Sequence, residues 1–414
     1  MANIRRARAA RYHSPVRILI DEAIPLPHLF APLGDVQSFS GRALSRELLH
    51  HADALIVRSV TRVDAALLDG SPVRFVGTAT TGLDHIDTTY LNHRGIRLAA
   101  AEGSNCRGVA EYVLAAIHHL SQRWGGSLSA KTLAVIGRGR IGSLVADWAS
   151  HCGMTVLACD PPLADLGTPG LHRFEDIAAH CDLVTLHVPL TAAGPHQTLN
   201  MVNRDWLARL RPGCILINTS RGEVIDEAAL AAAVRSGSLA APVLDVWQNE
   251  PRPDPKLVAL AAVATPHVAG YTAQSKTRAA QMLAAALADH IAPTDHVASA
   301  LPTDSIARHR PGGDDSPPGV ISVAPDVPAA VSHVLSHAVG LLATDLAFRD
   351  IVAALDPAAF DALRARCAAR REFPAFRIDG PLTPEARAIL THLGLPTEPA
   401  PVAPPGPRLR SSSG

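Results

Sequence analysis

The feature that most constrains the fold is a glycine-rich turn, Gly137-Arg138-Gly139-Arg140-Ile141-Gly142, between an apolar run at 131–137 and a helix-like stretch. In such a unit the first glycine permits a tight turn, the second lets a pyrophosphate approach the backbone, and the third allows close helix packing. The helix N-terminus then faces the phosphates. We therefore predict a dinucleotide-binding unit; the alternative is a glycine turn in an unrelated α/β sheet.

The next apolar run ends in Asp160, eighteen residues after Gly142. A carboxylate at this place accepts both ribose hydroxyls and repels a 2′-phosphate, so NAD is predicted over NADP. Arg138 and Arg140 are candidates for a 2′-phosphate, but both lie in the glycine turn, where contact with the pyrophosphate or solvent is more natural.

Short apolar runs alternate with helix-like stretches twice, first over 17–100 and again over 131–270, where six strand-like runs occur. This pattern predicts an α/β protein with two doubly wound parallel-sheet domains, one flavodoxin-like and one of the Rossmann type, followed by a small α/β domain. An alanine-rich helix at 275–291 is expected to return to the first domain. The predicted organisation is a basic extension (1–16), a substrate domain (17–117 and 279–301), an NAD-binding domain (118–278), a linker (302–319), a C-terminal domain (320–395) and a disordered tail (396–414).

The composition excludes several classes of partner. Thirty-eight basic residues balance thirty-eight acidic ones, so no net charge draws the chain to nucleic acid or an anionic membrane. No apolar run is long enough to cross a bilayer. Six cysteines without CxxC spacing favour reduced thiols and a cytoplasmic location. The extension at 1–16 has four arginines and no acid, which is typical of a transit peptide or a disordered arm.

Three later strand ends carry polar residues that packing does not explain: NTSRGEVID, LDVWQNEP and TPHVAGYT. Because the carboxyl ends of parallel strands border the ligand crevice, Arg221, Asp245, Glu250 and His267 are expected to converge. Oxidation of a 2-hydroxy acid needs a cation, a base and a group that orients the base. Arginine, histidine and glutamate suit these tasks.

Each of these residues also has an ordinary interpretation. A histidine is usually solvated or bonded in the core, an arginine is often a salt-bridge residue, and a glutamate before a proline can belong to a turn. His118 and His119, on the helix expected to connect the two domains, keep this ordinary interpretation. The joint occurrence of Arg221, Glu250 and His267 at successive strand ends favours the catalytic one.

With these motifs, residues 16–300 resemble the D-2-hydroxyacid dehydrogenases, through GRGRIG, the late arginine, the DVWxxEP-type segment and the histidine. The resemblance implies catalytic roles for Arg221, Glu250 and His267, with His267 as proton donor or acceptor. Position 188 holds valine where the family often has threonine, so a cofactor contact there would use the backbone. The implied NAD contacts are Gly137 to Gly142, Asp160, Val188, Thr219, Ser220, Arg221, Asp245 and Gly270, and the implied substrate contacts are Ser59, Thr80 and Tyr271. No metal is implied.

Within the family, the segments at 58–63, 76–87, 159–162 and 267–272 are most similar to members that act on a phosphorylated acid, 4-phospho-D-erythronate. The implied reaction gives 2-oxo-3-hydroxy-4-phosphobutanoate and NADH, on the way to pyridoxal phosphate. Residues 360–373 resemble a C-terminal dimerisation domain, which implies a homodimer. Alternatives are another 2-hydroxy acid, such as 3-phosphoglycerate, or a non-catalytic NAD-sensing regulator. For the substrate phosphate, the candidates are Arg58 and Arg62, or Arg370 and Arg371 of a partner chain.

Overall fold

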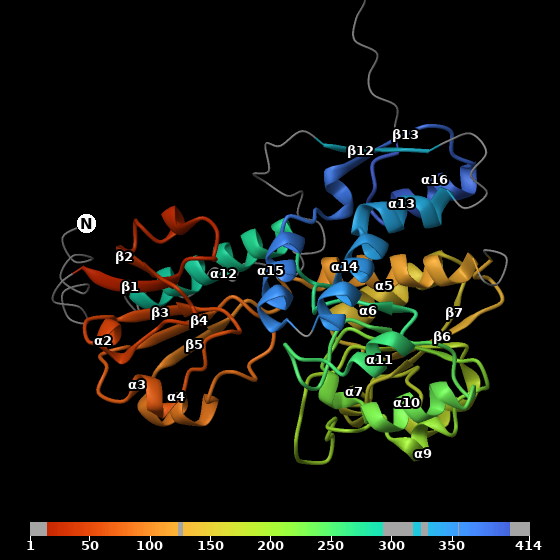
Figure 1. The fold of residues 1–414 in the computed structure, drawn as a ribbon. Helices are drawn as coiled ribbons and strands as arrows, with labels where there is room; N and C mark the ends of the chain where they lie inside the picture. The colour runs from red at the N-terminus through yellow and green to blue at the C-terminus, as the bar shows by residue number, and fades with distance from the viewer. Residues whose placement is uncertain (1–14, 123–126, 293–317, 324–329, 355, 398–414) are drawn as a thin grey trace, which may run out of the picture.

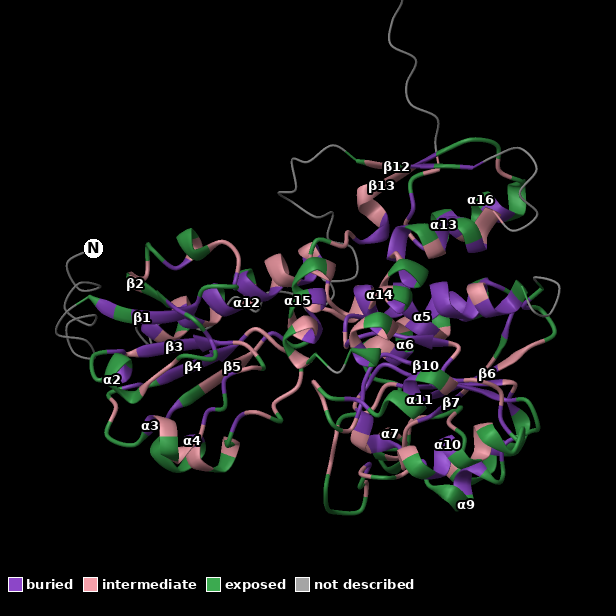
Figure 2. Ribbon diagram, in the orientation of Figure 1, coloured by how far each residue is buried: buried purple, intermediate pink, exposed green. Residues whose placement is uncertain are grey.

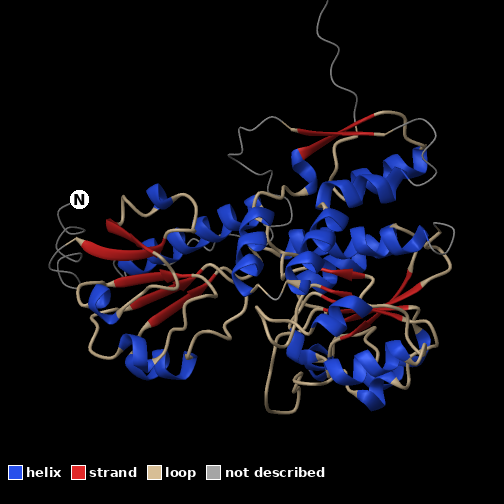
Figure 3. Cartoon of the chain, in the orientation of Figure 1, coloured by secondary structure: helices blue, strands red, loops and turns tan. Residues whose placement is uncertain are grey.

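The computed structural model describes residues 15–122, 127–292, 318–323, 330–354 and 356–397 and contains three units (Figures 1 and 3). Most of the basic extension, the linker and the tail expected from the sequence lies outside the described residues.

The first unit has a five-stranded parallel sheet in the order β2-β1-β3-β4-β5, which is the flavodoxin-like order expected from the sequence. Strands β3 and β4 are buried on both faces, which explains why they appear as continuous apolar runs. The strands are β1 (Val16–Asp21), β2 (Gly34–Phe39), β3 (Ala54–Val57), β4 (Phe75–Thr78) and β5 (Arg97–Ala100), and the helices include α2 (Arg46–Leu49), α3 (Ala65–Leu68) and α4 (Thr88–Arg94).

The second unit contains all six predicted strands in one parallel sheet, β11-β10-β9-β8-β6-β7. An isolated bridge between Ala158 and Leu171 extends the sheet beyond β7, so the order approaches that of dinucleotide-binding folds. The order reverses between β6 and β8, where such folds bind their ligand. The strands are β6 (Thr132–Ile136), β7 (Thr155–Cys159), β8 (Leu183–Leu186), β9 (Ile215–Asn218), β10 (Val243–Leu244) and β11 (Val263–Ala264), and the helices include α6 (Arg140–His151), α7 (Pro161–Asp165), α9 (Arg204–Leu207), α10 (Glu227–Arg235) and α11 (Pro255–Leu260).

Two long helices connect the first two units. α5 (Cys106–Ser121) leaves the first unit and is buried over most of its length, as Figure 2 shows, because α6 and the C-terminal unit cover it. α12 (Ala273–Ile291) follows the last strand of the second sheet and returns to pack on β4 and β5. Its residues Leu283 and Leu287 join the core of the first unit.

The C-terminal unit pairs two parallel strands, β12 (Gly319–Ser322) and β13 (Phe376–Asp379), with four helices. The helices are α13 (Ala330–Val339), α14 (Leu341–Ala353), α15 (Pro357–Cys367) and α16 (Pro384–His392). Side chains of this unit share one hydrophobic cluster with α5 and α6. Among the described residues, no single helix has the length and apolarity to cross a membrane, although the bent pair α13 and α14 meets the criterion by length and composition.

Candidate active site

The predicted catalytic residues follow neighbouring strands of the second sheet, at their carboxyl ends. Arg221 lies three residues after β9, Glu250 follows β10, and His267 follows β11. Since β9, β10 and β11 are adjacent and parallel, their ends meet at one edge of the sheet.

His267 and Glu250 form a direct hydrogen bond, with 2.8 Å between the His267 Nδ1 and Glu250 Oε2 atoms. The other carboxylate oxygen, Oε1, accepts the backbone N–H of Trp247 at 3.1 Å. Burial raises the pKa of Glu250, but the charge and hydrogen bond of His267, the charge of Arg364 and the Trp247 N–H together lower it below 4.5. An ionised Glu250 can accept the Nδ1 proton, an arrangement that suits the predicted role of His267, with Nε2 as the nitrogen for proton exchange.

The backbone of His267 is in a conformation that non-glycine residues rarely adopt, with φ at +57°. Asp245 maintains it: the Asp245 carbonyl accepts the His267 N–H at 2.6 Å, and its carboxylate accepts the N–H groups of Val268 and Ala269 at 2.8 Å. Strained conformations of this kind concentrate at functional sites, where the surrounding structure enforces them.

Asp245 is 1% exposed, and its carboxylate continues into a buried hydrogen-bond chain. The Thr265 hydroxyl donates to it at 2.6 Å and contacts the Tyr112 hydroxyl at 2.6 Å. Burial raises the pKa of Asp245, although His267 and these hydrogen bonds oppose the rise. A carboxylate has about four acceptor positions. Three are used within the described chain, so one remains for the predicted nicotinamide contact.

Arg221 reaches from the second unit to a loop of the first. Its Nε and Nη2 atoms lie 2.9 and 2.8 Å from Asp84 Oδ2. A Cβ atom on Gly82 would lie 1.7 Å from Arg221 Nη2, so a side chain at position 82 would displace the guanidinium. Sequence reasoning missed Asp84 as the partner of Arg221, although it lies inside VGTATTGLDHID; no residue pattern signals a pair 137 positions apart.

The glycine turn has the geometry that a dinucleotide needs. Gly137 has φ at +91°, and a Cβ on Gly142 would lie 1.8 Å from the Gly137 carbonyl oxygen. A Cβ on Gly139 would meet no atom within 4 Å, so the space above the turn is open to a ligand. Gly139 is also the N-cap of α6 and supplies no side-chain cap, so the first N–H groups of the helix are available for a pyrophosphate.

The remaining predicted cofactor residues surround this turn. Asp160, at the end of β7, accepts the backbone N–H of Arg138 at 2.7 Å and so holds the turn in place. Arg140 forms an exposed ion pair with Glu102 of the first unit. Val188 packs next to Gly137. Among the described residues the buried Thr219 hydroxyl has no hydrogen-bond partner, which is consistent with a polar ligand at the end of β9.

Other predicted contacts have partners within the chain. The hydroxyl of Ser220 donates to Asn218 at 2.7 Å, and the carbonyl of Gly270 accepts the Ser275 hydroxyl at 2.9 Å. Thr80 donates to the Gly82 carbonyl at 2.8 Å, which supports the loop that faces Arg221. Ser59 is exposed between Arg58 and Val60, two residues that line a cavity described next.

Tyr271, predicted to bind substrate, lines a cavity of about 400 Å³ between the first unit and α15. The Lys276 ammonium lies 4.4 Å and the Arg364 guanidinium 5.5 Å from the centre of its ring. Figure 1 shows α15 between the first unit and the second. We call the cations that line this space the cationic cavity set: Arg42, Arg58, Lys276 and Arg364.

The lining of this cavity contains few acidic residues. Asp361 is the one acidic residue in the described lining; it pairs with Arg42, and its Oδ1 atom lies 3.9 Å from Arg364 Nη1. The Arg58 Nε atom lies 2.9 Å from the buried Asp21 carboxylate. Burial lowers the pKa of Arg58, but the opposing effects of Asp21 and Tyr271 are larger, so the pKa is raised and the guanidinium stays charged. Arg364 leaves its buried Nε atom without a partner among the described residues. The cavity therefore suits an anionic group.

The other arginines considered for an anion lie elsewhere. Arg62 is exposed and pairs with Asp64 at 2.8 Å. Arg370 turns into its own chain, where Nη2 donates to the carbonyls of Gly108 and Ala269 at 3.0 and 2.5 Å. Burial lowers the Arg370 pKa, against the opposing effect of nearby carboxylates.

Residues 370–373 form hydrogen bonds with the segment after His267 and with Arg278 of α12. We call this set of contacts the C-terminal seam. Glu372 accepts the Thr272 hydroxyl at 2.8 Å and both terminal nitrogens of Arg278 at 2.5 and 2.9 Å. Arg278 in turn donates to the Ser104 carbonyl, just before α5. Asp245 and the C-terminal seam thus both bond the segment from His267 to Thr272.

Comparison with known proteins agrees with this geometry. Residues 109–269 match the family described as D-isomer specific 2-hydroxyacid dehydrogenase, NAD binding domain. A relative from Salinibacter ruber, named erythronate-4-phosphate dehydrogenase, is 41% identical over 382 residues, covering 89% of this chain and 95% of its own. The chain belongs to the D-2-hydroxyacid dehydrogenases. This D-2-hydroxyacid dehydrogenase is an NAD-dependent oxidoreductase, as its sequence predicts.

Other matches agree. A protein of the same name from Azotobacter vinelandii is 46% identical over 264 residues, covering 64% of this D-2-hydroxyacid dehydrogenase and 70% of its own chain. Among solved structures, the TT0316 protein from Thermus thermophilus is 27% identical, with a TM-score of 0.57, covering 68% of this chain and all of its own. A D-lactate dehydrogenase from Aquifex aeolicus complexed with NAD and lactic acid has a TM-score of 0.57 at 24% identity, covering 66% and 95% of the two chains, and shows the shared fold.

Proposed function

We propose that this chain oxidises 4-phospho-D-erythronate with NAD⁺ to 2-oxo-3-hydroxy-4-phosphobutanoate, in vitamin B6 biosynthesis. The names of the relatives support this substrate. The observation that carries the proposal is the cavity that the cationic cavity set lines. Tyr271, four residues after His267, and residues of α15 also line it. A phosphorylated acid has two anionic ends, and the site offers Arg221 for one and this cavity for the other.

The side chains have complementary tasks in this reaction. The carboxylate of the substrate binds Arg221, which shares its charge with Asp84 until substrate arrives. The Nε2 atom of His267 takes the hydroxyl proton while Glu250 holds Nδ1. NAD⁺ held at the glycine turn would supply the hydride acceptor for the carbon that carries this hydroxyl. Arg221 also stabilises the charge that develops on the oxygen.

A direct test incubates the purified chain with NAD⁺ and either 4-phosphoerythronate or 3-phosphoglycerate, and follows nicotinamide absorbance. We expect turnover of the first acid with a much higher kcat/KM. Comparable values for both would contradict the proposed substrate, while leaving the dehydrogenase chemistry intact. Absence of turnover with either acid, in protein that binds NADH, would favour the cofactor-sensing alternative.

A second test concerns the phosphate. Arg364→Ala should raise KM for 4-phosphoerythronate roughly tenfold to a hundredfold, the value of one or two hydrogen bonds to a charged group. KM for D-erythronate, which lacks the phosphate, should change little. Arg62→Ala is the matched control, because Arg62 is an exposed arginine outside the cavity. Arg364 is a sharper probe than Arg58, whose removal would also strand the buried Asp21.

We also propose a homodimer formed through the C-terminal unit. Leu342 and Leu346 lie one turn apart on α14 and are 44% and 64% exposed, an apolar pair that a partner would cover. Leu346→Glu should therefore yield monomers in sedimentation velocity. Leu166→Glu, at an 81% exposed leucine of the second unit, should leave the association state unchanged. Monomeric wild-type protein would contradict the proposal.

We propose a cytoplasmic location because the cysteines of the described chain form no disulfide bonds with one another. All six lie among the described residues and are free thiols. Reduced thiols are typical of the cytosol. We further propose, as its balanced charge suggests, that the chain binds neither nucleic acid nor membranes.

A further inference from the structure

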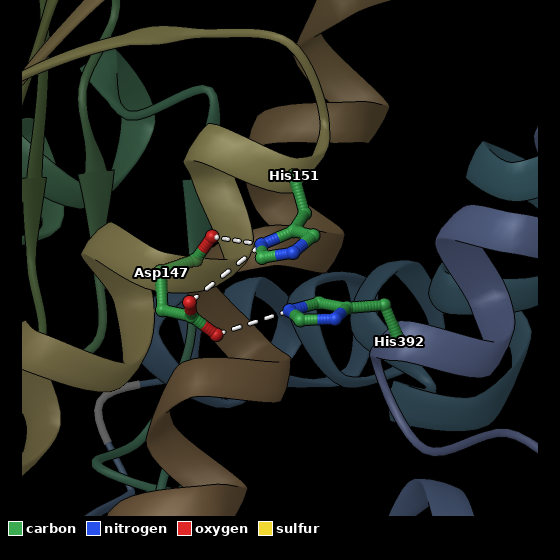
Figure 4. Close-up of side chains that lie close together, drawn as sticks. All are labelled: Asp147, His151 and His392. Atoms are coloured by element: carbon green, nitrogen blue, oxygen red, sulfur yellow. Dashed lines mark hydrogen bonds and ion pairs between the residues drawn. The ribbon is translucent and has the colours of Figure 1, made fainter.

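Helices α6 and α16 end at the same place on the surface, and each ends in a histidine. His151 is the last residue of α6 and His392 the last residue of α16. Asp147, one turn before His151, lies beside both rings (Figure 4). The three side chains connect the second unit to the C-terminal unit, across 245 positions of the sequence.

One ligand atom of each of the three residues lies within 4.8 Å of the other two. The Nε2 atom of His392 is 3.0 Å from Asp147 Oδ2. The Nδ1 atom of His151 is 3.0 Å from the Asp147 carbonyl and 3.6 Å from Oδ1. Figure 4 shows both nitrogens directed at Asp147. Two imidazoles and a carboxylate therefore lie close together, with one nitrogen of each ring near Asp147.

The electrostatics at this point favour a cation. Each helix C-terminus carries about half a negative charge, and Asp147 adds a full one. The centroids of the two imidazole rings are 3.2 Å apart, so both rings lie close enough to share a single ion.

We propose that Asp147, His151 and His392 bind a divalent transition-metal ion of the zinc class. Imidazole nitrogen and carboxylate oxygen are ligands that Zn²⁺ accepts, and three protein ligands leave a fourth position for water. The rings are now nearly parallel, at 16°, and must rotate for both lone pairs to reach one ion. Exposed fractions of 49% and 31% for the His151 and His392 side chains leave room for this rotation.

The ion would connect the two units rather than take part in the reaction. α6 begins at the glycine turn, and at 1.5 Å per residue His151 lies about 17 Å from that end. Bound metal would fasten α16 to α6 and so stabilise the attachment of the C-terminal unit. Turnover should not require it.

The test uses the full-length chain, stripped with a chelator and titrated with ZnCl₂ in a calorimeter. We expect one ion per chain and a rise in Tm of a few degrees at saturating zinc. His151→Ala, His392→Ala and Asp147→Asn should each weaken binding roughly tenfold or more, since each removes a ligand. Co²⁺ in place of Zn²⁺ should give visible absorption that the same variants lose.

A matched control is available on α13, where His333 and His337 are exposed and also one turn apart, with ring centroids 6.2 Å apart. They do not belong to the one three-ligand group found among the described residues. The variant His333→Ala/His337→Ala should therefore retain the ion and the Tm shift. Zinc binding that is equal in wild type and His151→Ala/His392→Ala, or that is lost in the control, would overturn the proposal. If His392→Ala unfolds, His392→Gln and the Co²⁺ spectrum provide the same test.

Discussion

The catalytic cleft and the C-terminal seam both depend on an arginine–carboxylate pair, and the two pairs differ in how firmly they are held. Arg221 in the cleft pairs with Asp84, whose side chain is 44% exposed. Arg278 in the seam pairs with Glu372, whose side chain is 4% exposed, and also bonds the Ser104 carbonyl. The first pair can open for a substrate carboxylate, whereas the second would leave a buried charge if it opened.

The cleft contains the groups proposed for the reaction, whereas the seam holds the backbone of the segment after His267 in place. In the cleft, a substrate carboxylate can replace Asp84 as the partner of Arg221, and substrate can approach the Nε2 atom of His267. In the seam, the buried Glu372 carboxylate bonds Thr272 and Arg278, and Arg370 Nη2 bonds the Ala269 carbonyl, so the segment from His267 to Thr272 stays in position. Substitutions in the cleft should therefore change turnover with little effect on stability, and substitutions in the seam should do the reverse.

The largest effect is expected at the base. His267→Ala should lower kcat by about 10²- to 10⁴-fold, because it removes the group that takes the proton. The free energy of unfolding should fall by less than for a substitution in the seam, because the Glu250 side chain left without its partner is 24% exposed; urea denaturation measures this. His172→Ala, at an exposed histidine of the same unit, serves as control. If both variants kept full activity, the catalytic assignment would be wrong.

In the seam, Arg278→Met should lower the free energy of unfolding by about 3 to 5 kcal/mol, because Glu372 is left as an uncompensated buried carboxylate. Urea denaturation followed by circular dichroism measures this loss. A stability change below about 1 kcal/mol would mean that the seam is no firmer than the cleft, and the comparison would fail.

Glu250→Gln should reduce kcat roughly tenfold or more, less than removal of His267, because the base remains but loses its ionic partner. Steady-state kinetics at saturating substrate gives this value. An undiminished kcat would show that the Glu250 carboxylate does not orient His267.

Glu250 should also make a small, pH-dependent contribution to the free energy of unfolding. The folded pKa of Glu250 lies below 4.5, so its contribution to stability is present above about pH 4.5 and is lost as the pH falls through the folded pKa. The difference in unfolding free energy between wild type and Glu250→Gln should be level at neutral pH and shrink below about 4.5. Urea titrations across this range measure it, and a difference that grew on acidification would contradict the lowered pKa.

The smallest effect is expected at an exposed pair outside both regions. Arg97 and Asp289 are 45% and 61% exposed in their side chains and lie 2.8 Å apart. Arg97→Ala should change the free energy of unfolding by less than about 1 kcal/mol, because water screens such pairs. A loss similar to that of Arg278→Met would show that burial does not explain the strength of the seam.

Much of this molecule is readable from local patterns. The glycine turn, Asp160 at the end of the next strand, and six strands in order follow from apolar periodicity and turn chemistry, and the structure contains them. The flavodoxin-like order of the first sheet was also predicted. By contrast, Asp84, Lys276 and Arg364 were missed, since no local spacing connects these residues to the site.

Arg370 illustrates the limit most clearly. Its sequence context, RREF, favours an exposed basic cluster, and so it was a candidate for phosphate binding by a partner chain. In the structure its guanidinium turns inward to two backbone carbonyls. A carbonyl acceptor has no sequence signature, because every residue carries one.

The amino-acid sequence alone determined the fold class and the cofactor, and it selected the three residues proposed for catalysis, because each depends on residue type at short, regular spacing. Only the tertiary structure decided which arginines line the cavity beside Tyr271, which one supports the segment after His267, and where two histidines meet one aspartate. These assignments depend on distances between segments far apart in the chain, and such distances arise only when the three units pack together.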